Sequence, residues 1–519
     1  MKSVLFILLT SLSVVAQIQS PASRLEALAR ANFPDIAEFP AELDLVQKVT
    51  TGEVADRGQD LPWHSESDNA DTPSHKWGRE REVRAKVIRW LSVGRDTREF
   101  VDPRGIRLAG GRILGDLDLS FANIPFPVWF VRCKLESLDL NGATVPSVNL
   151  SGSWGTQILA STARITQALS LGAFRADGQV NLVRAQIGDL QCDAATITRF
   201  GLFANGVAID GNASFAAFPI GGSVPPVPFH VNGPLNLEYA KIGGGLNLTG
   251  GEFINPTGNA IDLVGSTVKG PVFFFTASGP QRQAQYLDVR GAIDLRTATV
   301  GGIYLDQLHW PPAWLLEDLI YDKIYLQTTA FIGSWRYGLA PNAQQGLAWL
   351  ALDGSGSIQP YEQLAKVFDS FGDAHGARQI REMMESKLSE RNDSWPIRRL
   401  KNAIGYGYEP ENAIWGLGLV TVIGWLVYWG SYRMSKMVPT DKEAFDSMKS
   451  GGQLPQHYPR LSALIYSLEN TFPLVKLGQV EKWQPDTHLI RWFRWFQILI
   501  GWLLAALFAA GIAHLVQSH

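Results

Sequence analysis

Large apolar side chains recur at every fifth position between residues 180 and 207. The positions are Leu182, Ile187, Cys192, Ile197, Leu202 and Val207. An α-helix repeats its apolar face every 3.6 residues and a strand every 2, so neither element alone produces this interval. An interval of five instead predicts a square-walled parallel β-helix. Each of its four walls contributes one large side chain to a narrow core before the chain turns a corner.

The same interval continues on both sides of this stretch. Further members are Leu135, Leu140, Val145, Leu150, Leu237, Ile242, Leu263, Val268, Leu295, Val300 and Leu305. A small residue often stands two positions earlier, and a polar residue often lies between the two, as alternation along an extended chain requires. A sustained repeat indicates a solenoid in which each coil buries its neighbour. At about 20 residues per coil and about 4.8 Å per rung, the rod would be roughly 40 to 50 Å long.

Composition narrows the functional class. The chain has 519 residues, which predicts two or more structural units. Its 46 basic and 49 acidic residues are nearly balanced, which argues against a nucleic-acid partner. Cys133 and Cys192 both fall on inward positions about three coils apart, too far for a disulfide. We therefore expect both cysteines to fill the core.

The N-terminal part divides into four segments. Residues 1–19 carry one lysine and an apolar run, which predicts a secretory signal peptide or signal anchor. Residues 20–76 are expected to hold a short helix and a polar linker, and residues 77–104 a helical cap with an apolar stripe. The cap would cover the open end of the β-helix, which is expected to span 105–309.

Two regions interrupt or follow the predicted β-helix. Residues 218–234 are rich in proline and glycine, which predicts a projecting loop that carries His230. We expect this histidine to be structural, because the sequence places no partner near it. Residues 310–402 are expected to be helical, with a hairpin over 361–389 that resembles one tetratricopeptide-type unit.

The C-terminal part has the properties of a membrane segment. Residues 413–430 and 495–516 are uncharged, contain several tryptophans, and are long enough to cross a bilayer. The loop between them, 431–490, contains a moderately apolar stretch, 461–479, that predicts a re-entrant or interfacial helix. Two-helix channels have the same arrangement, in which a short broken helix lies between two membrane helices. The filter sequence of potassium channels is absent from this chain.

The distribution of basic residues predicts an orientation. The connecting loop and its borders carry Arg433, Lys436, Lys442, Lys449, Arg491 and Arg494, against Arg398, Arg399 and Lys401 before the first apolar segment. The excess places the connecting loop in the cytoplasm. The β-helix would then lie on the extracytoplasmic side of the cell membrane, as a signal peptide also implies.

Several motifs together resemble a bacterial family of large pentapeptide-repeat-like membrane proteins. They lie at residues 84–91, 101–108, 359–365, 404–408 and 466–479, and the resemblance covers nearly the whole chain from about Trp77 onward. Members of this family are often labelled hypothetical or "membrane-associated oxidoreductase". The resemblance implies a β-helix and membrane helices but no mechanism.

We find no motif for catalysis, a cofactor or a metal. The chain has no Cys-x-x-Cys, no His-Glu-x-x-His, no dinucleotide fingerprint and no phosphate loop. Asp118, Asp139, Asp262 and Asp294 share the outward position of their repeats and could form a ladder of carboxylates. Glycoside hydrolysis needs two such groups about 5 to 10 Å apart. We expect them instead to keep an exposed strand position soluble.

These observations predict a non-catalytic, membrane-anchored scaffold or binding protein. Its partners would be the lipid bilayer, a protein on the β-helix walls, and further copies of the chain. Two alternatives remain open. One is an oligomeric pore or sensor gated by the β-helix. The other is a membrane-associated oxidoreductase or glycan-acting enzyme.

Overall fold

The computed structural model describes residues 20–57, 77–220, 223, 225–278, 284–306, 310–311, 313–327, 342–395, 398, 410–451, 454–455, 457–472 and 474–517. The chain forms two compact units, Met1–Phe371 (unit 1) and Gly372–His519 (unit 2). The predicted signal segment 1–19, the motif 404–408 and residues 58–76 of the predicted polar linker lie outside the described residues.

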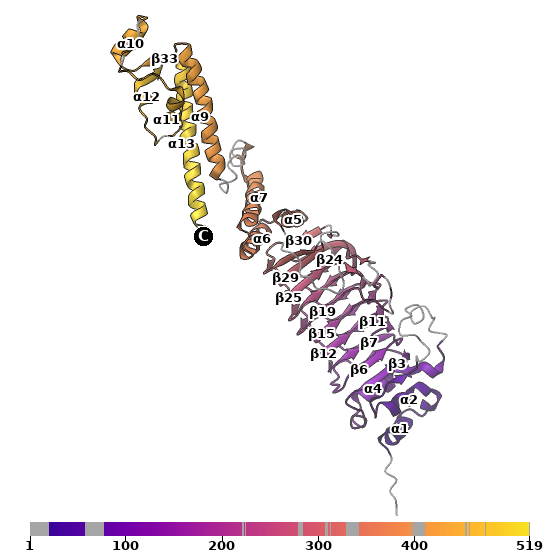
Figure 1. Ribbon diagram of the computed structural model, residues 1–519. Helices are drawn as coiled ribbons and strands as arrows, with labels where there is room; N and C mark the ends of the chain where they lie inside the picture. Colours follow the sequence, from indigo (N-terminus) through magenta and orange to yellow (C-terminus); the bar gives the residue numbers. More distant parts are fainter. Residues whose placement is uncertain are drawn as a thin grey trace, which may run out of the picture. The chain divides into compact units, whose positions relative to one another are not determined.

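Unit 1 is built on two large parallel sheets, whose strands lie in successive rungs (Figure 1). The fifteen-stranded sheet contains β1 (Ala55–Asp56), β3 (Ile106–Ala109), β6 (Val128–Val131), β8 (Thr144–Val145), β9 (Val148–Asn149), β12 (Arg164–Ser170), β15 (Gln186–Gln191), β18 (Ala208–Ile209), β19 (Ala213–Ser214), β22 (Lys241–Ile242), β23 (Leu246–Asn247), β25 (Thr267–Phe274), β29 (Thr299–Asp306), β31 (Ile320–Tyr321) and β32 (Ile324–Gln327).

The second sheet has thirteen strands. They are β5 (Leu117–Asp118), β7 (Ser137–Asp139), β10 (Trp154–Gly155), β11 (Gln157–Leu159), β13 (Arg175–Ala176), β14 (Val180–Asn181), β16 (Thr196–Ile197), β17 (Leu202–Phe203), β20 (His230–Asn232), β21 (Leu235–Asn236), β24 (Glu252–Asp262), β28 (Asp288–Asp294) and β30 (Ala313–Leu315). A short antiparallel pair, β26 (Ala277–Ser278) and β27 (Ala284–Gln285), lies between β25 and β28 along the chain.

Each sheet contains two ladders, and the chain visits the four ladders in turn. For example, Leu138 of β7 pairs with Ile158 of β11, and Ile158 pairs with Val180 of β14. Between Leu138 and Ile158 the chain passes through β8, β9 and β10. Long strands such as β12 join two ladders, since its beginning pairs with β8 and its end with β9.

The residues of the five-residue interval form the core of unit 1. Leu182, Ile187, Cys192, Ile197, Leu202 and Val207 are at most 2% exposed, and so are the other interval residues from Leu135 to Leu305. Inward burial of these side chains is therefore confirmed. Burying these side chains stabilises the folded state of unit 1 by about 25 cal/mol for each Å² of apolar area removed from water.

The ladders begin earlier and end later than the sequence predicted. The helix expected from Trp77 begins only at Ala85 (α4, Ala85–Val93), because residues 82–84 form a strand, β2 (Glu82–Arg84), that pairs with β4 (Arg112–Leu114). β1, from the predicted linker, pairs with β3. Helices α1 (Pro21–Asn32) and α2 (Pro40–Lys48) precede these strands, and Glu42 of α2 accepts hydrogen bonds from the Arg84 guanidinium.

At the other end, residues 313–327 continue the ladders, whereas the sequence predicts a helical region there. β30 pairs with β28, and β31 and β32 pair with β29. Helices α5 (Ala343–Leu350) and α6 (Gln359–Ser370) follow. Trp349 of α5 is fully buried and makes edge contacts with the rings of Trp314 and Tyr321. These aromatic rings close the apolar core at this end.

Unit 2 begins with α7 (Ala374–Asn392), the second helix predicted for the hairpin 361–389. Two long helices dominate the rest, α9 (Pro410–Arg433) and α13 (His488–Gln517), which pack along each other (Figure 1). Both are long and apolar enough to cross a membrane, over Asn412–Arg433 and His488–Ala509. Between them lie β33 (Met437–Pro439), α10 (Lys442–Lys449), α11 (Ala463–Thr471), α12 (Gln479–Lys482) and β34 (Trp483–Pro485).

Candidate functional site

The four aspartates proposed as a ladder lie on one line of paired strands. Asp118 pairs with Asp139, and Asp262 pairs with Asp294. Between these two pairs the same register carries Leu159, Asn181, Phe203 and Asn236. The carboxylates therefore form two separate pairs, not one continuous ladder.

These side chains cap the corners of the rungs. In each of the four aspartates, Oδ1 accepts a hydrogen bond from the backbone N–H two residues later, as in Asp262 to Val264 (3.1 Å) and Asp139 to Asn141 (2.8 Å). Asparagine does the same at Asn149, Asn181, Asn236 and Asn247. Asp and Asn are favoured in turns for this reason. Backbone capping, and not solubility alone, thus explains why Asp and Asn occur at these corner positions.

Three positions after many of these capping Asp and Asn residues, the chain has a residue with positive φ. The set includes Phe121 (φ 54), Gly142 (φ 63), Arg184 (φ 55), Tyr239 (φ 54), Gly265 (φ 65) and Thr297 (φ 58). In each corner the N–H of the next residue bonds to the carbonyl three residues earlier, for example Ala240 to Leu237 (3.0 Å). This geometry is a type II turn, which requires positive φ at its third residue. Where that residue is not glycine, stacked neighbours must hold the strained conformation.

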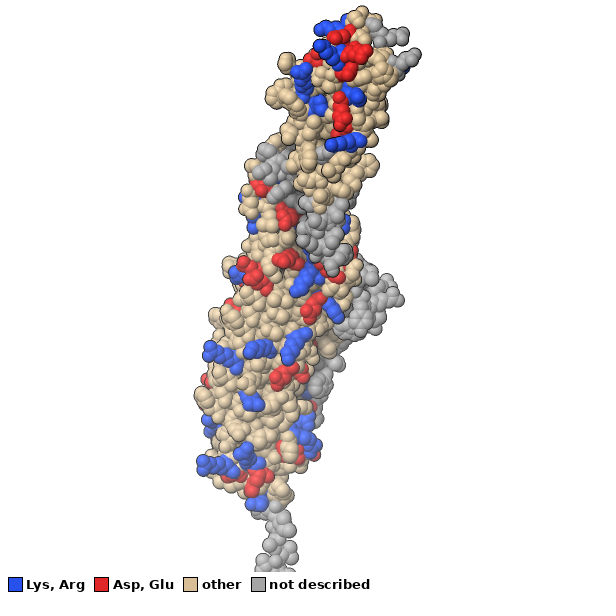
Figure 2. Space-filling model, turned by 90° about the vertical axis from the view of Figure 1, so that its left-hand side faces the viewer, with Lys and Arg blue, Asp and Glu red and all other residues tan. Residues whose placement is uncertain are grey.

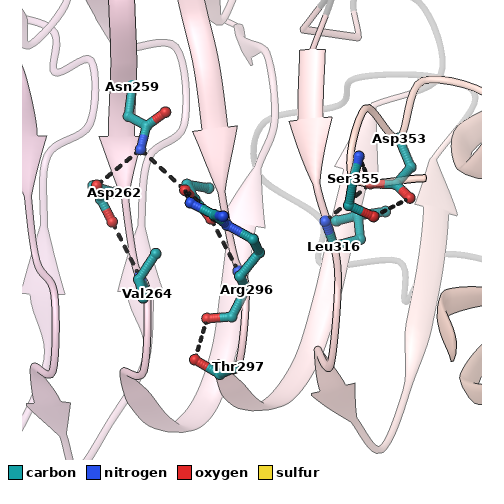
Figure 3. Close-up of polar contacts among 9 residues, drawn as sticks. Asn259, Asp262, Val264, Arg296, Thr297, Leu316, Asp353 and Ser355 are labelled. Atoms are coloured by element: carbon teal, nitrogen blue, oxygen red, sulfur yellow. Dashed lines mark hydrogen bonds and ion pairs between the residues drawn. The ribbon is translucent and has the colours of Figure 1, made fainter. Parts of the chain in front are cut away.

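Asp262 and Asp294 form the most buried polar group on this line (Figure 3). Asn259 Nδ2 donates to Oδ2 of both, at 2.9 and 3.0 Å. Arg296 donates to both oxygens of Asp294, with Nη2 at 2.6 Å from Oδ2. Burial raises the pKa of Asp262 above its usual value, and hydrogen bonds from Asn259 and Val264 oppose that rise. The two carboxylates thus contact the same amide nitrogen.

A substrate cannot reach this pair. The side chain of Asp294 is 0% exposed and its lone pairs are already occupied, while Asp262 is 7% exposed as a residue. Asp353 has an equivalent role one rung further on, where Leu315 replaces the aspartate. It accepts from the N–H groups of Leu316 and Ser355, both at 3.1 Å (Figure 3). The group has the geometry of structural caps.

His230 has a partner that the sequence did not reveal. It lies in strand β20 and not in a projecting loop, and Nδ1 is 3.0 Å from Oε2 of Glu252 on the adjacent strand β24. Gln285 donates to the other oxygen of Glu252 (3.1 Å). The hydrogen bond from His230 holds the pKa of Glu252 below its usual value. The two residues are 22 positions apart, about one coil, so the repeat register could have found the pair.

The cysteines are core residues. Cys133 and Cys192 are free, and each is 1% exposed. Burial raises the pKa of the Cys133 thiol to about 12, which leaves no reactive thiolate near neutral pH. Within the described residues there is no group of three or more His, Cys, Asp or Glu side chains that could hold a metal ion.

Unit 2 contains a buried polar network centred on Gln497 of α13. Its Nε2 donates to Ser467 Oγ and Thr471 Oγ1 of α11, both at 2.8 Å, and its Oε1 accepts from Tyr428 of α9 (2.8 Å). Ser467 Oγ donates to the carbonyl of Thr421 (2.7 Å). The network therefore joins all three helices. Neither the 3.6-residue pattern nor any motif in the sequence indicated it.

Two glycines allow α11 to approach the long helices. A Cβ on Gly501 would lie 2.1 Å from the Thr471 carbonyl oxygen, and a Cβ on Gly424 would lie 2.2 Å from Ser467 Oγ. By contrast, a Cβ on Gly418 of α9 would meet nothing within 4 Å. The first two glycines are thus required by packing, whereas Gly418 is not.

The chain after α11 returns towards the start of that helix. Glu469 accepts four backbone hydrogen bonds, from Leu477 and Gly478 (3.1 Å) and from Gln479 and Val480 (2.9 Å). Gln479 in turn accepts from the N–H of Ser462, the N-cap of α11, at 3.1 Å. We call residues 462–472 and 474–479 the return segment. Its two ends, Ser462 and Gln479, lie side by side.

Comparison of the chain with models of protein families, with curated proteins and with solved structures found no match.

Proposed function

We propose that unit 1 is a right-handed quadrilateral parallel β-helix of the pentapeptide-repeat kind, and that the protein is a non-catalytic scaffold or binding protein tethered to a membrane by unit 2. Four parallel ladders, with the interval residues turned inward, support the β-helix. The Asp262–Asp294 pair is closed to solvent and the Cys133 thiol is buried, and both features favour a structural role for these groups within a binding protein.

The observation that carries this proposal is a wall of outward side chains in register. On one ladder of the larger sheet, Asn149, Ser170, Gln191, Ser214 and Asn247 stand on successive rungs. Ser170 donates to Gln191 (3.1 Å) and Asn247 to Ser214 (3.3 Å). Amide and hydroxyl side chains fixed in this way suit hydrogen bonding to an extended partner chain.

The same ladder ends in aromatic residues. Phe273, Tyr304 and Tyr325 follow Asn247 on the next three rungs. The rings of Tyr304 and Tyr325 stack at 4.6 Å between centroids, and Phe273 lies 5.0 Å from Tyr304. Aromatic side chains are enriched in protein interfaces because they bury large areas. We therefore propose a protein partner along this wall, here called the register wall.

Photo-crosslinking tests the proposed partner surface. A photoreactive residue at Gln191, which is exposed on the register wall, is expected to crosslink one protein species in intact cells. The same residue at Lys241, which is also exposed but lies on a different ladder, is the matched control. Equal labelling from both positions, or none from Gln191, would contradict a specific partner on this wall.

Membrane anchoring needs its own test. We expect the intact chain to require detergent for extraction, and its recovery in the soluble fraction would reject the anchor. For the proposed topology, reporter fusions at Ser74 and His519 should be extracytoplasmic and a fusion at Asp441 cytoplasmic. The excess of basic residues between the two apolar helices supports this orientation.

A second candidate function, an oligomeric pore, is favoured by the return segment. In a bilayer, α11 would enter between α9 and α13 and the chain would leave on the same side, which makes the segment re-entrant. Non-helical backbone at membrane depth is tolerated where it is buried in protein or lines a water-filled cavity. Ion flux from the purified chain in lipid vesicles would distinguish a pore from a simple anchor.

A further inference from the structure

The return segment lies deep along the two long helices. The Thr471 carbonyl touches Gly501, seven residues beyond Arg494 on α13, and Ser467 touches Gly424, nine residues before Arg433 on α9. At 1.5 Å per residue these points lie about 10 and 14 Å below the last arginine of each helix. Half of a ~30 Å hydrocarbon core is about 15 Å. The C-terminal end of α11 would thus be near the middle of a bilayer.

Three exposed side chains lie on the stretch that leads back from this end of α11. Leu474 is 91% exposed, Leu477 is 51% exposed, and Lys476 between them is exposed. The N–H of Leu477 donates to Glu469, two residues before the last residue of α11, which holds the backbone next to Lys476 close to this end of the helix. No carboxylate among the described residues lies within ion-pair distance of Lys476. Glu481 is the nearest acidic residue in sequence, and Glu469 already accepts four backbone N–H groups.

Lipid is a poor environment for this surface. A lysine near the centre of a bilayer costs about 2.5 to 3.5 kcal/mol on insertion scales, and more by other measures. The backbone beside it is not helical and would also have to stay hydrated or be covered by protein. The apolar faces of α9 and α13, by contrast, suit lipid, with Trp415, Leu419, Leu499 and Trp502 each more than half exposed.

We propose that several copies of this chain pack with their return segments facing a common water-filled axis, and that Lys476 makes this axis a pathway for small inorganic anions such as chloride. The proposal rests on the second candidate function above. In a closed ring each copy presents the same surface, so one lysine per chain becomes a ring of positive charge. Rings of lysine or arginine select anions in pores.

Ion selectivity is the direct test. The purified full-length protein is reconstituted in phosphatidylcholine–phosphatidylglycerol vesicles, and the reversal potential is measured under a KCl gradient. The wild-type chain is expected to prefer chloride, Lys476→Gln to lose that preference, and Lys476→Glu to prefer potassium. Lys442→Gln, an exposed lysine on α10, is the control and should keep the chloride preference. A current whose selectivity is the same in all Lys476 variants would overturn the proposal.

Crosslinking tests the assembly separately. Because Cys133 and Cys192 are buried, Leu474→Cys supplies one accessible thiol per chain. We expect Leu474→Cys to form disulfide-linked dimers in vesicles, and Leu419→Cys, on the exposed face of α9, to form none. Dimers without any anion current would reject the pathway. Neither dimers nor current would reject the whole inference, while the register-wall crosslinks from Gln191 would still decide the scaffold proposal on their own.

Discussion

Unit 1 and the region of unit 2 where α11 packs against α9 and α13 place polar and apolar side chains differently, although unit 2 also has an apolar core around Met437 and Trp483. In unit 1 the interior is apolar, and the buried carboxylates of Asp262 and Asp294 sit at corners where they cap backbone N–H groups. In unit 2 the interior between the long helices is polar around Gln497, while large apolar side chains such as Leu499 and Trp502 are exposed. Figure 2 shows charged side chains gathered at the end of unit 2 that carries α10.

The membrane tether proposed above would explain this contrast, because the two units would then face different solvents. In water, the free energy of folding comes mainly from removing apolar area, so apolar residues belong inside. Between helices in lipid there is no such driving force, and close packing and hydrogen bonds hold the helices together. Gly424 and Gly501, which let α11 approach, and the Gln497 network supply those two interactions.

Truncating an apolar side chain should therefore change stability by very different amounts at a core position of unit 1 and on the exposed face of α9. Ile187→Ala removes a core side chain that is 1% exposed, and we expect a loss of about 3 kcal/mol from the stability of unit 1. Leu419→Ala removes one that is 62% exposed on α9, and we expect a change below about 0.5 kcal/mol. Circular dichroism of thermal unfolding in detergent, which separates β from helical signal, measures both.

Equal losses from the two variants would contradict the contrast, because Leu419 would then be part of an apolar core. Ile187→Val is the control for unit 1. It keeps the β-branched shape and should cost only about 0.5 to 1.5 kcal/mol.

The core of unit 1 could be predicted from sequence because its signal is local and periodic. Every member of the five-residue interval is buried, and both apolar C-terminal helices lie where length and composition placed them. The predicted bounds of the β region were wrong at both ends because β1, β2 and β30 to β32 are short strands outside the repeat pattern. Their pairing depends on neighbouring rungs, which no local pattern reports.

The candidate sites were harder to predict because they join distant residues. Asn259 bridges two aspartates that are 32 positions apart, and Glu252 reaches His230 across one rung. In unit 2, Gln497 contacts Tyr428 on the other long helix, 69 positions away. Composition showed only that each residue was present. The register that brings them together follows from the lengths of the intervening insertions.

Removing the polar centre of unit 2 is expected to have an intermediate effect. Gln497→Leu keeps a similar volume but removes the hydrogen bonds to Tyr428, Ser467 and Thr471. Hydrogen bonds between membrane helices contribute about 0.6 kcal/mol each on average, so we expect a loss of about 1 to 2 kcal/mol. The helical transition in detergent should move to lower temperature while the β transition stays unchanged.

The control for this variant is Gln484→Leu in β34, where the side chain is exposed and should tolerate the change. A Gln497→Leu protein as stable as the wild type would mean that packing alone holds α11. A shift of the β transition as well would mean that the two units unfold together.

The smallest effect is expected at the His230–Glu252 pair, which lies on the outer face of unit 1. The hydrogen bond from His230 lowers the folded-state pKa of Glu252 below its usual value. A carboxyl with a lowered folded pKa contributes stability above its unfolded pKa of about 4.3, and this contribution is lost as the pH falls through the folded pKa. Both side chains are about 30% exposed, and solvent screening keeps the contribution below about 1 kcal/mol.

His230→Ala should therefore be slightly less stable than the wild type near neutral pH, and the difference should disappear at acidic pH once Glu252 is protonated. His375→Ala is the control, because His375 lies on α7 in unit 2 and contacts Gln379 instead of a carboxylate. The β transition of unit 1, followed from neutral to acidic pH, measures the difference. A gap between His230→Ala and the wild type that stays constant down to low pH would show that the histidine stabilises β20 by packing and not through the charge of Glu252.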